Sequence, residues 1–276
     1  MTTHAGTARR PGVLLPLVRA AHAGPTVAVT TVVALLAVAL GLGAYDGAVV
    51  TAAVLAGQLT IGWGNDLRDA RRDREGGRAD KPLATGEVAP SVVRRCLVGA
   101  GVACVVLSLL AGWQSAVVHL ALGVASGHVY NLRAKATAWS WLPYAVAFGS
   151  LPAVVGLADA PPTVPPAWMA LTAALLGVGA HFLNALPDLA DDAATGVRGL
   201  PHRLGATTSR ALATSLLVAG TLVAVLGPAG VPPAWTWAAL AVVVLLAGVA
   251  LLGRGRTPFH AAVATALVDV VLLVAA

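Results

Sequence analysis

The chain has 276 residues, of which 58% are hydrophobic and 11% are charged, whereas a soluble domain carries about 25% charged residues. Its mean hydropathy is +0.81, and this composition excludes a soluble globular domain. A net charge of +6 is compatible with nucleic-acid binding, but the basic residues lie only in the tail and loops between apolar segments, which excludes nucleic acid as a partner.

Apolar segments of about 20 residues follow one another along the chain, and this length predicts membrane-spanning helices, because a helix satisfies its own backbone hydrogen bonds in lipid. After a cytoplasmic N-terminal tail (1–24), we predict one all-α domain (25–276), a polytopic membrane protein with nine transmembrane helices around a central cavity. The predicted spans are residues 25–44, 47–67, 92–112, 115–131, 139–157, 166–187, 209–227, 233–252 and 257–275.

The basic residues alternate between loops. All 18 Lys and Arg residues lie in the N-terminal tail or in every second loop, and the other loops, around Asp46, Gln114, Pro162 and Pro228, contain none. This positive-inside pattern predicts a cytoplasmic N-terminus and an external C-terminus in the plasma membrane.

Arg19 and His22 stand just before the first predicted span. One interpretation is a basic anchor at the lipid headgroups. The other places this end of the tail over the cytoplasmic ends of the acidic helices that come later in the chain. The sequence leaves both interpretations open.

The second predicted span runs into an acidic row. Asn65, Asp66, Asp69 and Asp73 share one helix face, because each residue of a helix advances by about 100°. The next loop, residues 74–83, is charged and rich in Gly. It is too long for a tight turn, so it forms either a short helix or lid, or a loop without regular structure.

The sixth predicted span ends in a second acidic row. Asn184, Asp188 and Asp192 share a helix face in the same way, and Asp191 lies just beside it. Pro187 interrupts this helix, so we expect a kink or a broken turn there. Broken helices are tolerated at membrane depth only where they line a protein cavity.

The two regions 66–87 and 188–192 hold nine of the 12 acidic residues. Carboxylates at the C-terminal end of a helix oppose its dipole, so a positive partner must offset their repulsion. Neighbouring Arg residues are one candidate, and divalent metal is the other. Oxygen ligands without Cys or clustered His favour Mg²⁺, or Mn²⁺, over zinc. Two rows that each hold one ion suit a lipid diphosphate clamped between them.

The acidic rows and their surroundings resemble the UbiA superfamily of intramembrane aromatic prenyltransferases. The resemblance covers most of the chain and rests on Asn65-Asp66-x2-Asp69-x3-Asp73, Asp188-x3-Asp192, the Tyr130/Lys135 pair and the stretch 196–205. It implies transfer of a prenyl group from a prenyl diphosphate donor to an aromatic or other lipophilic acceptor in the bilayer. Mg²⁺ would ionise the donor to an allylic cation that the helices shield from water.

The resemblance also implies roles for individual residues. The catalytic residues would be Asp66, Asp69, Asp73, Asp188 and Asp192. One metal ion would be held by Asn65, Asp66, Asp69 and Asp73. The other would be held by Asp188 and Asp192, and Asn184 and Asp191 contribute because Ala185 stands where many relatives have Asp. The residues that would bind substrate are Asn65, Arg72, Tyr130, Lys135, Asn184, Arg198 and Arg203.

Two departures from the family pattern concern diphosphate binding. Tyr130 and Lys135 are one residue further apart than the common spacing, which leaves open whether Lys135 or Arg133 contacts diphosphate. Lys81 replaces a frequent Arg.

Other functions fit parts of the pattern. An intramembrane terpene cyclase of the same superfamily would ionise the donor and close the cation on its own double bonds, without an acceptor. A transporter is disfavoured, because transporters place ion ligands near the bilayer midplane. Asp269, deep in the ninth span, is either functional or a hydrogen-bonded structural residue.

Overall fold

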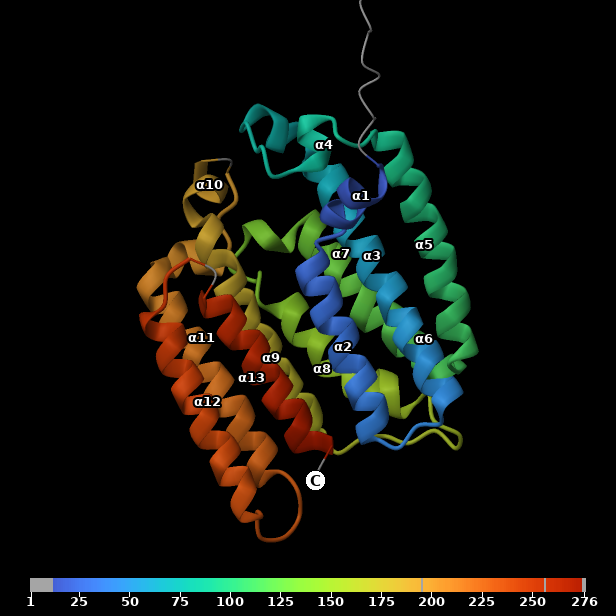
Figure 1. Ribbon diagram of the computed structural model, residues 1–276, viewed down its shortest axis with the longest axis vertical. Helices are drawn as coiled ribbons and strands as arrows, with labels where there is room; N and C mark the ends of the chain where they lie inside the picture. Colours follow the sequence, from blue (N-terminus) through green and yellow to red (C-terminus); the bar gives the residue numbers. More distant parts are fainter. Residues whose placement is uncertain (1–11, 195, 256, 275–276) are drawn as a thin grey trace, which may run out of the picture.

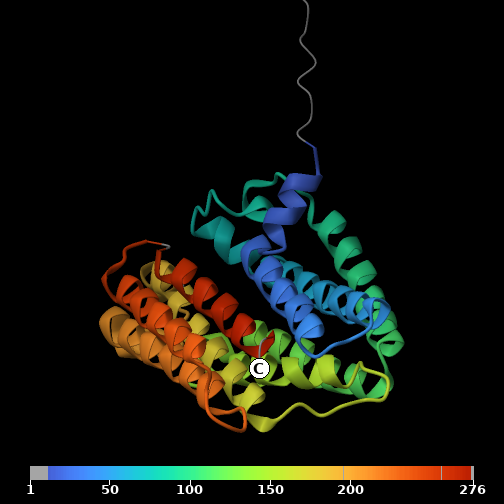
Figure 2. The same cartoon turned by 60° about the horizontal axis from the view of Figure 1, so that its bottom comes forward.

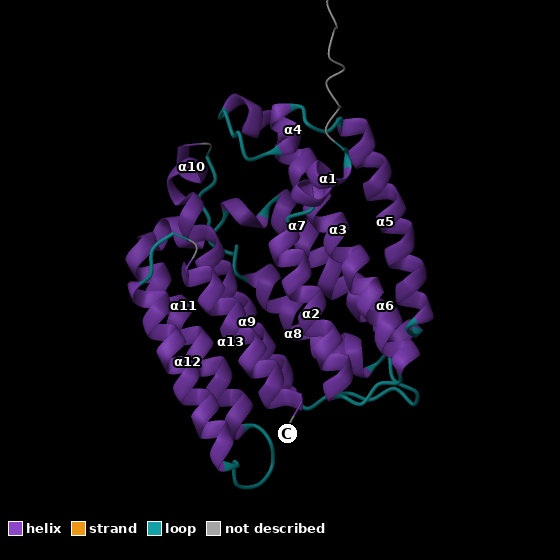
Figure 3. Cartoon of the chain, in the orientation of Figure 1, coloured by secondary structure: helices purple, strands orange, loops and turns teal. Residues whose placement is uncertain are grey.

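The protein is all-helical. The computed structural model describes residues 12–194, 196–255 and 257–274, and no strand occurs within these ranges. Helices joined by short loops make up most of the chain (Figure 3). The predicted fold class is confirmed in this respect.

The helices have the following bounds: α1 Leu14–Ala20, α2 Ala23–Ala39, α3 Ala44–Glu75, α4 Pro82–Thr85, α5 Pro90–Leu110, α6 Trp113–Val118, the π-helical turn η1 His119–Val124, α7 Ala125–Leu132, the 3₁₀ turn η2 Ala134–Ala136, α8 Leu142–Gly156, α9 Ala167–Ala185, the 3₁₀ turn η3 Leu186–Asp188, α10 Leu189–Ala194, α11 Leu200–Leu226, α12 Ala234–Leu252 and α13 Thr257–Val274.

Each of the nine predicted spans overlaps a helix. The fourth is one uninterrupted helix formed by α6, η1 and α7 in succession. Five helices are long and apolar enough to cross a membrane: α3, α5, α9 extended to Asp188, α11 and α12. α1 and α2 qualify only as a pair, bent by 74°. By length and composition, the part of the chain that the structure describes thus supports five or six spans, and the number nine stays a prediction.

Consecutive helices pack side by side and close into a ring. α2 packs on α3, α3 on α5, α8 on α9, α9 on α11, α11 on α12, and α12 on α13. α13 then contacts α2, which joins the last helix to the first (Figure 1, Figure 2). An apolar core between α2, α3 and α8 contains the fully buried Val33, Val50 and Val154.

Large apolar side chains also cover the outside of the ring. On α5, Val98 and Val102 are 66% and 61% exposed, and Val105 and Leu109 continue the same helix face. On α12, Leu245 is 71% exposed. Soluble proteins rarely expose apolar surface on this scale, whereas a helix surrounded by lipid presents such a face to it.

Three segments differ from their predicted boundaries. The predicted N-terminal tail contains α1, whose Leu17 packs on the buried cluster of Leu83, Val88 and Val93. α3 continues to Glu75, since residues 65–75 contain neither Gly nor Pro, and it ends before Gly76 and Gly77, where Gly77 adopts a φ of 67°. α11 begins at Leu200 rather than at 209, with a non-helical Gly205 at φ 78°. The charged loop after α3 leads into the short helix α4, as one of its two interpretations predicted.

Candidate active site

The first acidic row lies along the buried face of α3. Asp66, Asp69 and Asp73 are only 1%, 7% and 7% exposed. α4 covers this end of α3 through Leu83, which packs with Leu67. Buried carboxylates are costly unless charged or hydrogen-bonding groups compensate them, so their partners show what the row requires.

Three cations compensate the row. Lys81 Nζ lies 2.9 Å from Asp66 Oδ1, and Lys135 Nζ lies 2.6 Å from Asp69 Oδ2. Arg72 Nη2 reaches the same Asp69 oxygen at 2.9 Å. Arg72 is the kind of local partner that the sequence suggests, whereas Lys81 comes from the loop after α3 and Lys135 from the 3₁₀ turn η2. The structure thus brings Lys135 to the row, while Arg133 is exposed.

His22 is a member of this cluster that the sequence did not identify as a site residue. Its Nε2 lies 2.8 Å from Asp66 Oδ1 and 3.3 Å from both Asn65 Nδ2 and Lys81 Nζ. Of the two interpretations of this segment, the structure supports the one that places it over the acidic helices. Only the position of His22 just before the first span gave a signal.

The second acidic row follows the predicted break in its helix. α9 ends at Ala185, so Asp188 lies in the 3₁₀ turn η3 and Asp192 in α10. Arg78 Nη2 is 3.5 Å from Asp188 Oδ1, and His202 Nε2 is 3.6 Å from Asp192 Oδ2. The Asp191 side chain, another predicted ligand, lies outside the described residues.

Basic residues that pair with the first acidic row also act on Asp192 of the second row. Burial raises the pKa of Asp192, and repulsion from Asp188 adds to this shift, while His202, Arg72 and Lys135 lower the pKa. Arg72 and Lys135 are the same cations that pair with Asp69. Asp192 therefore lies within electrostatic reach of two cations that pair with the first row.

The loop after α3 connects the two rows physically. Arg78 follows the first row by five residues, and its backbone N–H donates to the Asp73 carbonyl at 2.9 Å. Its guanidinium holds Asp80 at 2.9 and 3.0 Å and reaches Asp188. These hydrogen bonds lower the pKa of Asp80 to about 2.

Three aromatic side chains, Tyr130, Tyr144 and Phe148, pack against one another in an aromatic layer near Asn184. The Tyr130 and Tyr144 rings meet edge to face at 5.1 Å, and Tyr144 stacks on Phe148 at 6.0 Å. The Tyr144 hydroxyl interacts with both Tyr130 and Asn184. Asn184, which stands one helical turn before Asp188, thus belongs both to the acidic row and to this aromatic layer.

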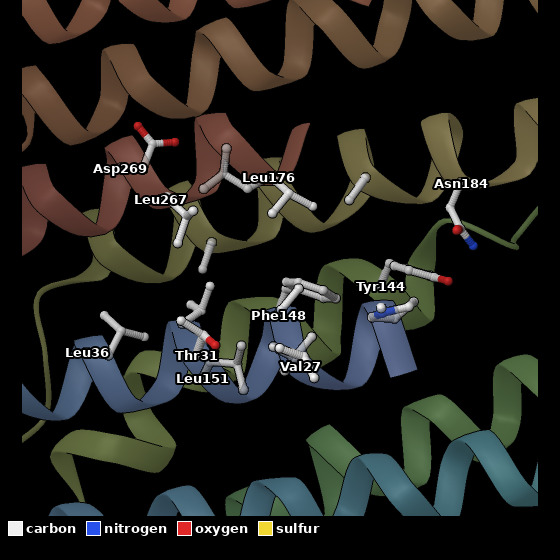
Figure 4. Close-up of a pocket in the computed structure, with 18 of the residues that line it drawn as sticks. Val27, Thr31, Leu36, Tyr144, Phe148, Leu151, Leu176, Asn184, Leu267 and Asp269 are labelled. Carbon is white, nitrogen blue, oxygen red and sulfur yellow. The ribbon is translucent and has the colours of Figure 1, made fainter. Parts of the chain in front are cut away.

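Tyr144 and Phe148 also line an apolar cavity of about 440 Å³ (Figure 4). α2, α8, α9 and α13 line it, and Asn184 and Tyr144 stand at one end. Asp269 lines the other end, and Figure 4 shows its carboxyl turned away from the Leu267 side chain. Neither of its buried carboxyl oxygens has a hydrogen-bond partner among the described residues, so both interpretations of Asp269 stay open.

Two predicted diphosphate-binding residues, Arg198 and Arg203, are exposed. Arg203 Nε donates to the Arg198 carbonyl at 3.1 Å instead of pairing with a carboxylate that the structure describes in the acidic rows.

The comparisons with known proteins agree with this geometry. The UbiA prenyltransferase family matches residues 26–262, which is most of the chain. The chain belongs to the UbiA prenyltransferase family. It is therefore a prenyltransferase, and its apolar helices make it an integral membrane protein. No curated protein matches its sequence significantly.

Solved UbiA homologues share the fold at low sequence identity. The apo homologue from Aeropyrum pernix K1 aligns with a TM-score of 0.72 at 16% identity, over 96% of this chain and 98% of that one. The Archaeoglobus fulgidus homologue bound to GPP and Mg²⁺ gives 0.69 at 14%, over 95% and 100%. A digeranylgeranylglyceryl phosphate synthase structure gives 0.64 at 15%, over 95% and 98%.

The acidic rows of this UbiA protein fit a hard divalent cation. Asp66 Oδ2 is buried and has no hydrogen-bond partner among the described residues, and an orphaned carboxylate oxygen is costly unless a cation or donor satisfies it. Within those residues no three His, Cys, Asp or Glu side chains form a ready-made metal cage. Mg²⁺ does not require one, because it takes one or two carboxylates, waters and phosphate oxygens.

Proposed function

We propose that this protein transfers a prenyl group from a prenyl diphosphate to an aromatic or other lipophilic acceptor inside the membrane. One observation carries this proposal: the acidic rows and their cations lie at one end of an apolar cavity, with Asn184 shared by both. A substrate with a charged head and an apolar chain fits this boundary. Measured along α2 from Gly24 to Leu36, which both line the cavity, the apolar part extends over roughly 18 Å.

The two acidic rows are the proposed sites for two Mg²⁺ ions, with Mn²⁺ as a substitute. Asn65, Asp66, Asp69 and Asp73 would hold one ion. The other would be held by Asn184, Asp188, Asp191 and Asp192. The Archaeoglobus fulgidus homologue was solved with GPP and Mg²⁺, which supports a divalent ion on a prenyl diphosphate. When bound, Mg²⁺ neutralises the charge that develops on the leaving diphosphate.

The basic groups already at the site would bind the diphosphate directly. Lys81, Lys135, Arg72 and Arg78 each hold a carboxylate oxygen. When divalent cations neutralise these carboxylates, the basic groups are free to turn to phosphate oxygens. The Tyr130 hydroxyl is a further hydrogen-bond donor for phosphate, and the exposed Arg198 and Arg203 are candidates at the rim.

The interior would protect the reactive allylic group. Tyr144 and Phe148 of the aromatic layer line the cavity, and aromatic faces stabilise a nearby cation. The apolar lining excludes water, which would otherwise quench that cation. The acceptor would then capture it within the same cavity.

The proposed arrangement in the membrane follows from the charge pattern. We infer that residues 25–276 form a nine-span domain with the N-terminus cytoplasmic and the C-terminus external, in the plasma membrane. The acidic rows would then face the cytoplasm, where water-soluble diphosphate is released.

The test is product analysis of the purified protein. Farnesyl or geranylgeranyl diphosphate is incubated with Mg²⁺, with and without a panel of aromatic and lipid acceptors. We expect a prenylated acceptor and inorganic diphosphate only when an acceptor is present. Cyclic hydrocarbon or alcohol formed from the donor alone would establish the terpene cyclase instead. If no donor is consumed in either case, the proposed function is wrong.

A further inference from the structure

His22 lies at an unusual point of the backbone. It occupies the 74° bend between α1 and α2 and adopts φ 54° and ψ 59°, the left-handed region. Among the described residues it is the only one other than Gly with positive φ. Such a conformation is costly and persists only where the surroundings enforce it, which is common at functional sites.

Three contacts enforce the bend. The Thr26 hydroxyl donates to the Ala21 carbonyl at 2.8 Å, and the Trp63 indole donates to the Leu17 carbonyl at 3.0 Å. Ala21 packs directly on Gly62, where an added Cβ would collide with the Ala21 carbonyl oxygen. Gly62 therefore permits the close approach that places the bend over the first acidic row.

The bend delivers the imidazole to one carboxylate oxygen. With its proton on Nε2, His22 donates to Asp66 Oδ1 at 2.8 Å, and Lys81 donates to the same oxygen at 2.9 Å. The other oxygen, Oδ2, is buried without a hydrogen-bond partner among the described residues. Two donors on one oxygen fix the rotamer of Asp66 and leave the second oxygen available.

We propose that His22 is a positioning residue of the first metal site: it holds Asp66 by Oδ1 so that Oδ2 remains open to a divalent cation. This inference rests on the proposed metal-dependent function. On this inference the N-terminal segment takes part in metal binding and is more than a basic anchor at the lipid headgroups. Partners that orient metal ligands typically change metal affinity by 10–100-fold when they are removed.

The test measures Mn²⁺ binding to the full-length protein in detergent, by the loss of the free Mn²⁺ electron paramagnetic resonance signal, with and without inorganic diphosphate. His22→Ala removes the donor, and His22→Gln retains one of similar reach. Arg19→Ala is the matched control, because Arg19 lies on the same segment but pairs with Glu87 and the Asp80 carbonyl. Size-exclusion profiles and melting curves establish that each variant is folded.

We expect His22→Ala to weaken Mn²⁺ binding about tenfold or more, His22→Gln to recover part of the loss, and Arg19→Ala to bind like the unaltered protein. Unchanged binding in His22→Ala would overturn the inference. Equal losses of Mn²⁺ binding in His22→Ala and Arg19→Ala would also overturn the inference, because anchoring of α1 would explain both losses. A His22→Gln variant that binds Mn²⁺ no better than His22→Ala would overturn it as well.

This test is separate from the proposed function. If the His22 variants lose Mn²⁺ as expected but the unaltered protein consumes no prenyl diphosphate, the proposed function fails and the role of His22 stands. If the unaltered protein consumes the donor but Mn²⁺ binding is the same in the His22 variants, the proposed function stands and the role of His22 fails.

Discussion

Gly177 controls the width of the cavity through a neighbouring ring. A Cβ at this position of α9 would lie 2.5 Å from Phe148 Cγ and 2.6 Å from Phe148 Cβ. Carbon atoms in contact are about 3.5–4.0 Å apart, so Gly177→Ala requires Phe148 to move by about 1 Å. Because Phe148 lines the cavity and α9 blocks its other side, we expect the ring to move into the cavity.

The narrower cavity should discriminate against long donors. Overpacking of this kind costs about 1–3 kcal/mol of stability, and one methylene in an apolar pocket changes kcat/KM by about 10–200-fold. We therefore expect kcat/KM to fall about tenfold or more for the longest donor accepted and to change little for the shortest. The assay is donor consumption across C5, C10, C15 and C20 diphosphates.

Two controls isolate the ring. Gly248→Ala makes the same change in α12, where an added Cβ meets nothing within 4 Å, and it should leave the donor profile unaltered. Phe148→Leu in the Gly177→Ala background should restore long donors by removing ring atoms. A folded Gly177→Ala protein with an unaltered profile would refute the argument, as would an equal change in Gly248→Ala.

Three other results are expected. Asp69→Asn and Asp188→Asn should each reduce kcat by about 100-fold or more without loss of folding, and normal turnover in either would show that its row is not catalytic. Chelation of divalent ions with EDTA should abolish donor consumption, and Mg²⁺ or Mn²⁺ should restore it; activity that survives EDTA would contradict the metal-dependent mechanism. Asp269→Asn should preserve both activity and donor profile, because the Asp269 carboxyl is turned away from the Leu267 side chain that lines the cavity (Figure 4), and a shifted profile would show that this group contacts substrate.

The acidic rows were predictable because their geometry is local. Asn65 to Asp73 follow the period of a single helix, and α3 continues through them without a break. The interruption near Pro187 was also readable, since proline removes a backbone donor. The family resemblance added the identity of the substrate class, which spacing alone does not supply.

The partners of these rows were harder to predict because they are distant in the sequence. His22 and Asp66 are 44 residues apart, and Lys135 and Asp69 are 66 apart. The first contact depends on a left-handed residue and on close packing against Gly62, neither of which leaves a pattern in hydropathy. The orientation of Asp269 likewise depends on how α13 rotates against α11, which the composition of α13 does not determine.

In the proposed two-metal site, Arg78 would make the loading of one acidic row depend on the other. It is tethered by its backbone to Asp73 of the first row and reaches Asp188 of the second with its side chain. A cation at Asp188 would displace this guanidinium, and the released charge would act on the first row through their shared loop. Linkage then requires the reverse influence to be equal, so titrations of the two ions should show thermodynamic cooperativity instead of two independent isotherms.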